Sequence, residues 1–191
     1  MLAEMLAVLW AATYLLASRV MPSVYGRQNS GGCERWRNFW GIPNQLIVLP
    51  LLHVVGGVTS ERAFLYIFFL YLALDFVLVK MDFVIQLHHV VCLIGHGIVV
   101  GLLSQGVSTY MTGVVALEIG GGFSNIYDLH KSARWPAIAF AVGMTISNAA
   151  AAMVAYEWAL LPIQVLPKAC TLMMTAGLIV MRQKSGMEAI L

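Results

Sequence analysis

Residues 71–97 read YLALDFVLVKMDFVIQLHHVVCLIGHG, two apolar runs separated by a short polar turn at Lys80 and Asp82. Each run is unbroken, whereas a strand of a membrane barrel alternates apolar and polar residues. Unbroken runs indicate helices, because lipid requires every backbone N–H and C=O to be paired within the segment. The stretch therefore predicts two transmembrane helices joined at one face of a membrane.

Composition extends this interpretation to the whole chain. Of its 191 residues, 60% are hydrophobic and 10% are charged, and the mean hydropathy is +0.83. A soluble domain carries about 25% charged residues, so this chain suits lipid rather than water as its solvent. Three cysteines without a CxxC pair predict neither a disulfide framework nor a metal site. The fold class that we expect is an all-α membrane protein.

Seven apolar segments can be drawn along the chain, each near the ~20 residues that cross a bilayer. They cover residues 2–17, 42–58, 63–79, 83–103, 107–126, 136–155 and 158–181. We expect one transmembrane domain over residues 1–191, with a first helix at 2–17, a basic cytosolic loop at 18–41 and a core over about 36–184. Glu4 and the absence of a basic flank predict that the first helix is retained. The loop ends in CERWRNFWG, which is typical either of a segment at the headgroup level or of an ordinary basic loop.

Basic residues are divided unequally between the two faces that seven helices create. Nine of the 11 lie on one face and Arg62 alone lies on the other, while Lys168 falls within the seventh segment. The nine are Arg19, Arg27, Arg35, Arg37, Lys80, Lys131, Arg134, Arg182 and Lys184. The positive-inside rule makes their face cytosolic. We therefore expect a lumenal or exterior N-terminus and a cytosolic C-terminus, in the endoplasmic reticulum or the plasma membrane.

Ionisable side chains inside the predicted helices are candidates for function, because charge is costly to bury in lipid. At ~1.5 Å rise per residue, Asp75 lies roughly 6 Å below the cytosolic face, His88 and His89 roughly 8–10 Å and Glu118 roughly 12 Å. Three helices thus bring carboxylates and imidazoles to one shallow layer, which we predict to be a catalytic site. Adjacent histidines point about 100° apart on a helix. We therefore expect one of the pair to react and the other to support it by hydrogen bonding.

Three more polar residues are predicted to line a cavity or to bind its lipid. His96 extends the His89 face of its helix towards the membrane centre. Lys168 either pairs with Glu118 or lines the cavity. Asn148 either lines the cavity or links two helices by hydrogen bonding.

The stretch at 71–97, followed by ALEIGGGFSNIYDL at 116–129, resembles the TLC domain of the ceramide synthases and the translocating-chain-associated membrane proteins. The matching residues are Asp75, His88, His89, Glu118, Phe123 and Asn125. The chain departs from the family pattern at Gly120 and Gly122, where Ser and Pro are frequent, and at Cys92, where ceramide synthases have Thr. It also lacks their paired-Asp motif. The likeness is therefore closer to the small TLC-domain proteins.

This resemblance implies a seven-helix TLC-type bundle around a central, lipid-accessible cavity, with Asn125 among the cavity residues. It implies a role in lipid homeostasis, through sphingolipid or phospholipid acyl composition, by lipid binding or regulation. The alternative is an acyl-CoA-dependent N-acyltransferase of ceramide-synthase type that uses the double His, and a bis-His haem protein is a remote one. We expect no cofactor other than acyl-CoA as a co-substrate. The expected partners are membrane lipids and, for acyl transfer, long-chain acyl-CoA, with no nucleic acid; a homo- or hetero-oligomer is left open.

Overall fold

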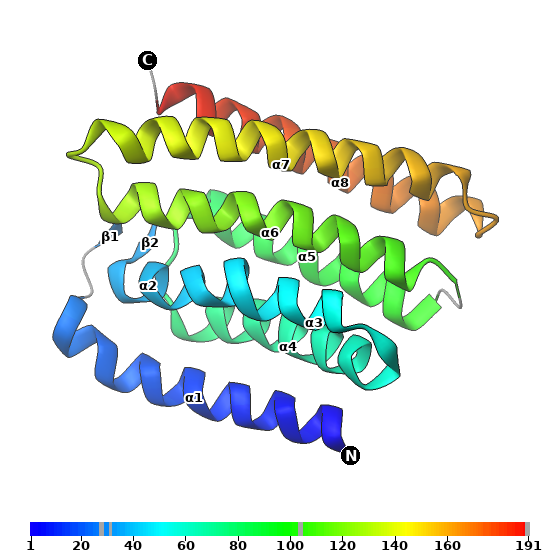
Figure 1. Ribbon diagram of the computed structural model, residues 1–191, viewed down its shortest axis with the longest axis horizontal. Helices are drawn as coiled ribbons and strands as arrows, with labels where there is room; N and C mark the ends of the chain where they lie inside the picture. Colours follow the sequence, from blue (N-terminus) through cyan, green and yellow to red (C-terminus); the bar gives the residue numbers. More distant parts are fainter. Residues whose placement is uncertain (27–28, 31, 103–104, 190–191) are drawn as a thin grey trace.

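The computed structural model describes residues 1–26, 29–30, 32–102 and 105–189, so Arg27 and Leu103 of the predictions above lie outside it. In these ranges the chain is almost entirely helical (Figure 1). The elements are α1 (Leu2–Tyr25), β1 (Asn29–Ser30), β2 (Cys33–Glu34), α2 (Arg35–Pro43), the π-helical turn η1 (Asn44–Val48), α3 (Leu49–Val55), α4 (Gly57–Leu78), α5 (Phe83–Leu102), α6 (Val107–Leu129), α7 (Arg134–Leu160) and α8 (Val165–Glu188).

The elements α2, η1 and α3 form one continuous helical run. Asn44 and Leu49, which mark the two junctions, both have right-handed helical backbone angles. The widened π turn ends just before Pro50, whose ring would clash with the carbonyl four residues earlier in a regular helix. A π turn therefore lets this run pass its proline and continue to Val55.

The helices lie side by side along one axis of the molecule (Figure 1). Helix α1 packs against α4 and α2, α6 packs against α7 and α2, and α7 packs against α8. In Figure 1 the pair α7 and α8 lies farthest from α1, and the two chain ends lie at opposite ends of the bundle. The short strands β1 and β2 pair at the end of the bundle where α1 ends and α2 begins.

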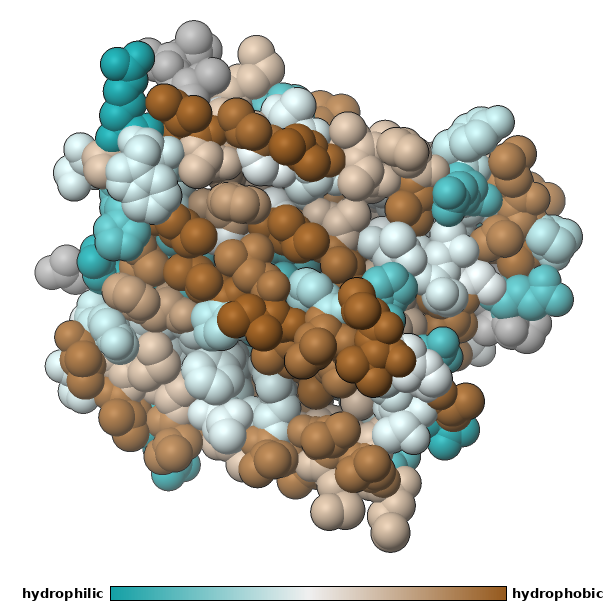
Figure 2. Space-filling view, viewed as in Figure 1, coloured by the Kyte–Doolittle hydropathy of each residue, from teal (hydrophilic) through white to brown (hydrophobic). Residues whose placement is uncertain are grey.

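Within the described ranges, four helices are long and apolar enough to cross a membrane: α1, α5, α7 and α8. Large apolar side chains are exposed on the outer surface, among them Val54, Val77, Phe83 and Ile146, and Figure 2 shows apolar side chains gathered over much of the visible face. Several charged and amide side chains are instead buried between the helices. This inside-out distribution indicates a membrane-embedded, all-α protein.

The first helix and the loop after it differ from the predicted boundaries. Helix α1 does not end at residue 17, because the hydroxyls of Ser18 and Ser23 donate to carbonyls three residues back and a polar sequence continues as helix. Helix α2 begins at Arg35, inside the stretch 18–41 that was predicted to be a loop. Trp36, in the first turn of this helix, is buried within the protein.

The last predicted helix also begins elsewhere. Trp158, the first residue of the predicted segment 158–181, belongs to the end of α7. The chain leaves the helix at Leu161 and re-enters one at Val165, with Pro162 between them. Hydropathy did not detect this break because the residues around the proline are themselves apolar.

Candidate functional site

A fully buried ion pair joins the first half of the bundle. Asp75, on α4, is 0% exposed. Arg37, on α2, donates to its Oδ2 atom through Nε at 2.7 Å and through Nη2 at 2.6 Å. The hydroxyl of Tyr14, on α1, donates to Oδ1, and Arg37 also donates to the hydroxyl of Tyr71. Both oxygens of the Asp75 carboxylate thus accept hydrogen bonds, one from a side chain on α1 and the other from a side chain on α2.

A relay of side-chain amides leads from this ion pair to the second buried carboxylate. Nη1 of Arg37 donates to Oδ1 of Asn125 at 3.3 Å. Nδ2 of Asn125 donates to Oε1 of Gln45 at 2.7 Å, and Nε2 of Gln45 donates to Oε2 of Glu118 at 2.6 Å. Every donor in this relay meets an acceptor, so the amide orientations are mutually consistent.

The two adjacent histidines have different surroundings. Nδ1 of His89 lies 2.9 Å from the carbonyl of Ile85, and its Nε2 lies 3.2 Å from Oδ2 of Asp75. Both ring nitrogens therefore face oxygen atoms that accept hydrogen bonds. His88 is half-buried, and its hydrogen-bond partner is the Sγ atom of Cys92, 3.7 Å from Nε2. His89 is thus held in the packed layer, while His88 is not.

Two cavities meet at His88 and Glu118. A polar cavity of about 460 Å³ lies on the side of the ion pair, and an apolar cavity of about 100 Å³ lies between α5, α6, α7 and α8. Residues that line the polar cavity include Arg37, Gln45, His89, Asn125, Arg182 and Lys184. The apolar cavity is lined by residues such as Cys92, Gly95, Val114, Trp158, Leu172, Met174 and Leu178. His88 and Glu118 line both.

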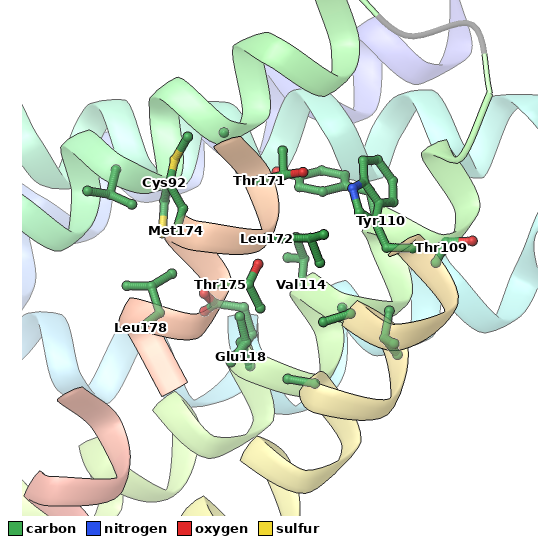
Figure 3. A pocket seen from close by; sticks show the side chains of 18 of the residues that line it. Cys92, Thr109, Tyr110, Val114, Glu118, Thr171, Leu172, Met174, Thr175 and Leu178 are labelled. Atoms are coloured by element: carbon green, nitrogen blue, oxygen red, sulfur yellow. The ribbon is translucent and has the colours of Figure 1, made fainter. Parts of the chain in front are cut away.

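Figure 3 shows how the apolar cavity is built. Glu118 lies at one edge, Cys92 and Met174 lie together on one side, and Tyr110 lies at the far end. His96 sits behind that end, with Nδ1 3.1 Å from the hydroxyl of Tyr110. The cavity therefore runs from an ionisable edge into an apolar interior.

Glycines at 120–122 allow three neighbours to approach α6 closely. A Cβ atom on Gly120 would lie 2.5 Å from Nη2 of Arg182, and one on Gly121 would lie 2.8 Å from Nε2 of Gln45. A Cβ on Gly122 would lie 2.5 Å from the side chain of Leu46. Gly120 thus admits an arginine from α8, and Gly121 and Gly122 admit side chains of the η1 turn.

Arg182 brings a second cation to the polar cavity. Its Nη2 atom donates to the carbonyl of Leu117, one residue before Glu118. Its Nε atom is buried and has no hydrogen-bond partner among the residues that the structure describes. The guanidinium thus retains a donor in the wall of a cavity.

The remaining predicted residues lie apart from this junction. Nζ of Lys168 donates to the carbonyls of Ala159 and Leu161 at the end of α7, so its partners are backbone oxygens rather than Glu118. Nδ2 of Asn148 donates to Oε1 of Gln183 at 3.0 Å, which links α7 to α8. Of the two roles predicted for Asn148, the structure shows the hydrogen bond that links two helices.

The predictions missed Arg37, Tyr14, Gln45 and Arg182. Arg37 was assigned to a basic cytosolic loop because of the polar composition of residues 18–41, and Arg182 was assigned to the cytosolic end of the last helix. The available signal was helical spacing, since Trp36, which is buried, and Trp40, which is half-buried, lie four residues apart on one helix face beside Arg37.

Metal or haem ligation has little support in this arrangement. Among the described residues, no group of three or more His, Cys, Asp or Glu side chains could hold a metal ion. Ligation of a haem through both His88 and His89 would remove His89 from Asp75 or from the carbonyl of Ile85.

Comparison with protein-family models, with curated proteins and with solved structures gives no match.

Proposed function

We propose that this protein is a multi-pass membrane protein of the TLC type that holds a lipid, with an acyl chain in the apolar cavity and a polar head at His88 and Glu118. The observation that carries the proposal is the meeting of an apolar and a polar cavity at these two ionisable residues. A lipid has the same division between tail and head. Binding of this kind suits a role in lipid homeostasis, such as the control of sphingolipid or phospholipid acyl composition.

The proposed topology is seven membrane crossings, with α2, η1 and α3 counted as one. Two observations support it: the chain ends lie at opposite ends of the bundle, and most basic residues of the described ranges flank the end that holds the C-terminus. The N-terminus then lies in the lumen or outside, and the C-terminus in the cytosol of a cell whose endoplasmic reticulum or plasma membrane holds the protein. Terminal tags in sealed vesicles should show opposite protease sensitivity, and equal sensitivity would contradict this topology.

A matched pair of glycines on α5 tests lipid binding. Gly95 lines the apolar cavity, and a Cβ atom there would meet only Sδ of Met174, at 3.8 Å. Gly97 is exposed, and a Cβ atom there would meet nothing within 4 Å. Gly95→Leu should therefore fill the cavity, while Gly97→Leu adds the same side chain to the outer surface.

Mass spectrometry of co-purified lipids gives the readout. We expect Gly95→Leu to lower the bound lipid by about tenfold, the equivalent of about 1.4 kcal/mol of binding, and Gly97→Leu to leave it unchanged. Equal lipid content in wild type and Gly95→Leu would contradict the cavity as the binding site.

Acyl transfer is the second candidate, and the contrast between His88 and His89 favours it. His89 contacts the Asp75 carboxylate, while His88 faces the junction where an acyl group and a polar head would meet. An imidazole there can act as a general base between a long-chain acyl-CoA and a lipid amine. Purified protein should then release CoA, and His88→Ala should lower the rate by roughly 100-fold or more. A lipid regulator predicts no repeated, catalytic release of CoA.

A further inference from the structure

Cys92 is the cysteine that lines the apolar cavity, and it lies one helical turn after His88 on α5. Its Sγ atom is 3.7 Å from Nε2 of His88. In Figure 3 its side chain lies beside Met174 at the edge of the cavity. A thiol, a basic nitrogen and an apolar cavity are thus brought together at one place.

The other two cysteines lack this combination. The thiol of Cys33 donates to Oδ1 of Asn38 at 3.2 Å and lines the polar cavity. Cys170 lies on α8 and is not among the residues that line either of the two cavities. Both therefore serve as internal controls for a reaction that depends on the position of Cys92.

We propose that Cys92 is a nucleophile that accepts a long-chain acyl group as a thioester, with His88 as its general base. The proposal rests on the proposed function, because the acyl chain is delivered through the apolar cavity. A nucleophile within hydrogen-bonding reach of a base is the arrangement that activates a thiol for acyl transfer. His88 can serve because it contacts neither Asp75 nor a backbone carbonyl, in contrast to His89.

The reaction exchanges one thioester for another. Sγ of Cys92 forms a bond to the acyl carbon of a long-chain acyl-CoA, and the bond from that carbon to the CoA sulfur breaks. The thiol proton passes to Nε2 of His88 and then to the departing CoA sulfur. The products are acyl-Cys92 and free CoA, and no oxidant, reductant or energy source is required.

Burial of the thiol selects the donor. The acyl carbon of a lipid-like donor reaches Cys92 when its chain occupies the apolar cavity, whereas a small water-soluble electrophile gains nothing from that cavity. We therefore expect the modification to occur with long-chain acyl-CoA. With acetyl-CoA it should be much slower, because the acetyl group lacks a long hydrocarbon chain that could occupy the cavity.

Intact-protein mass spectrometry tests the proposal on protein purified in lipid nanodiscs and incubated with palmitoyl-CoA. Wild type should gain one palmitoyl group, which neutral hydroxylamine removes because it cleaves thioesters. Cys92→Ala should lose the adduct, Cys170→Ala should retain it, and His88→Ala should slow its formation by roughly 100-fold. Co-purified lipid, measured in the same samples, reports whether each variant still binds in the cavity.

Two results would overturn the assignment while the lipid-binding function stands. One is a wild-type protein that binds lipid in a manner sensitive to Gly95→Leu but forms no adduct with palmitoyl-CoA. The other is an adduct that persists in Cys92→Ala or resists hydroxylamine. Absence of bound lipid and of adduct together would instead contradict the proposed function on which the assignment rests.

Discussion

The Arg37–Asp75 cluster and the His88–Glu118 junction use similar side chains in opposite ways. In the cluster, both carboxylate oxygens of Asp75 accept hydrogen bonds, and Tyr14, Arg37 and His89 surround them. At the junction, the hydrogen-bond partner of His88 is a thiol, and two cavities lie beside it. Polar groups that satisfy one another hold helices together, whereas polar groups with unused capacity beside open space can bind or react. The comparison thus separates structural from functional residues within one polar layer.

The largest effect is expected at the centre of the cluster. Arg37→Met leaves the buried Asp75 carboxylate without its cation, which costs about 3–5 kcal/mol of folding free energy. Arg35→Met is the matched control, because Arg35 is half-buried and lies over the ring of Phe39. Thermal unfolding in detergent should show a large loss for Arg37→Met and a small one for Arg35→Met. Equal losses would contradict a structural role for the ion pair.

The adjacent histidines give the second test. His89→Ala removes a contact from both Asp75 and the carbonyl of Ile85, so we expect a loss of about 1–3 kcal/mol in the free energy of unfolding. His88→Ala removes the contact with Cys92 and a ring contact with His89, but no contact with Asp75, and should cost less. Among variants that elute as folded protein, His88→Ala should lower CoA release or acyl-adduct formation more than His89→Ala does. A larger loss of stability in His88→Ala than in His89→Ala would contradict a structural role for His89 and a functional role for His88.

Cys33 provides a test that depends on pH. It is 4% exposed, and burial raises the pKa of its thiol to about 11. Since the thiolate is the reactive form, maleimide labelling at Cys33 should be slow at neutral pH and should rise by about tenfold per pH unit until the pH reaches about 11. Peptide mass spectrometry after timed labelling measures this profile. A rate that levels off near pH 9, the ordinary thiol pKa, would show that Cys33 is not buried in the packed layer.

The smallest effect is expected between Glu118 and Lys168. Glu118 accepts a hydrogen bond from Gln45, whereas Lys168 donates to backbone carbonyls at the end of α7. The stability changes of Glu118→Gln and Lys168→Met should therefore add to within about 0.5 kcal/mol in the double variant. A larger coupling energy in this double-mutant cycle would place the two side chains in contact.

Depth along a helix could be predicted from the sequence, and rotation about the helix axis could not. Asp75, His88, His89 and Glu118 were predicted to share a layer. The structure links three of them, Asp75, His89 and Glu118, in one hydrogen-bonded network that also includes Arg37, Asn125 and Gln45. Lys168 could not be placed correctly, because its pairing depends on which way α8 turns and on where the chain breaks before it.

The buried arginines were harder to predict than the carboxylates. An acidic residue inside an apolar run is visible at once, as Asp75 shows, but Arg37 lies in a polar stretch whose composition is that of a surface loop. Its role is set by partners that are distant in the sequence, Asp75 and Asn125. The close packing at Gly120 could not be predicted either, because Arg182, which packs against it, comes from α8.

Photo-crosslinking tests the acyl-chain cavity most directly. A fatty acyl lipid with a diazirine on its chain is bound to protein in nanodiscs and irradiated, and the adducts are mapped by peptide mass spectrometry. We predict adducts, located to single residues by fragmentation, on cavity-lining side chains such as Val91, Val114, Leu172 and Met174, and their loss in Gly95→Leu but not in Gly97→Leu. Adducts confined to outward-facing side chains such as Ile94 and Met173, with the same pattern in all three proteins, would contradict the account.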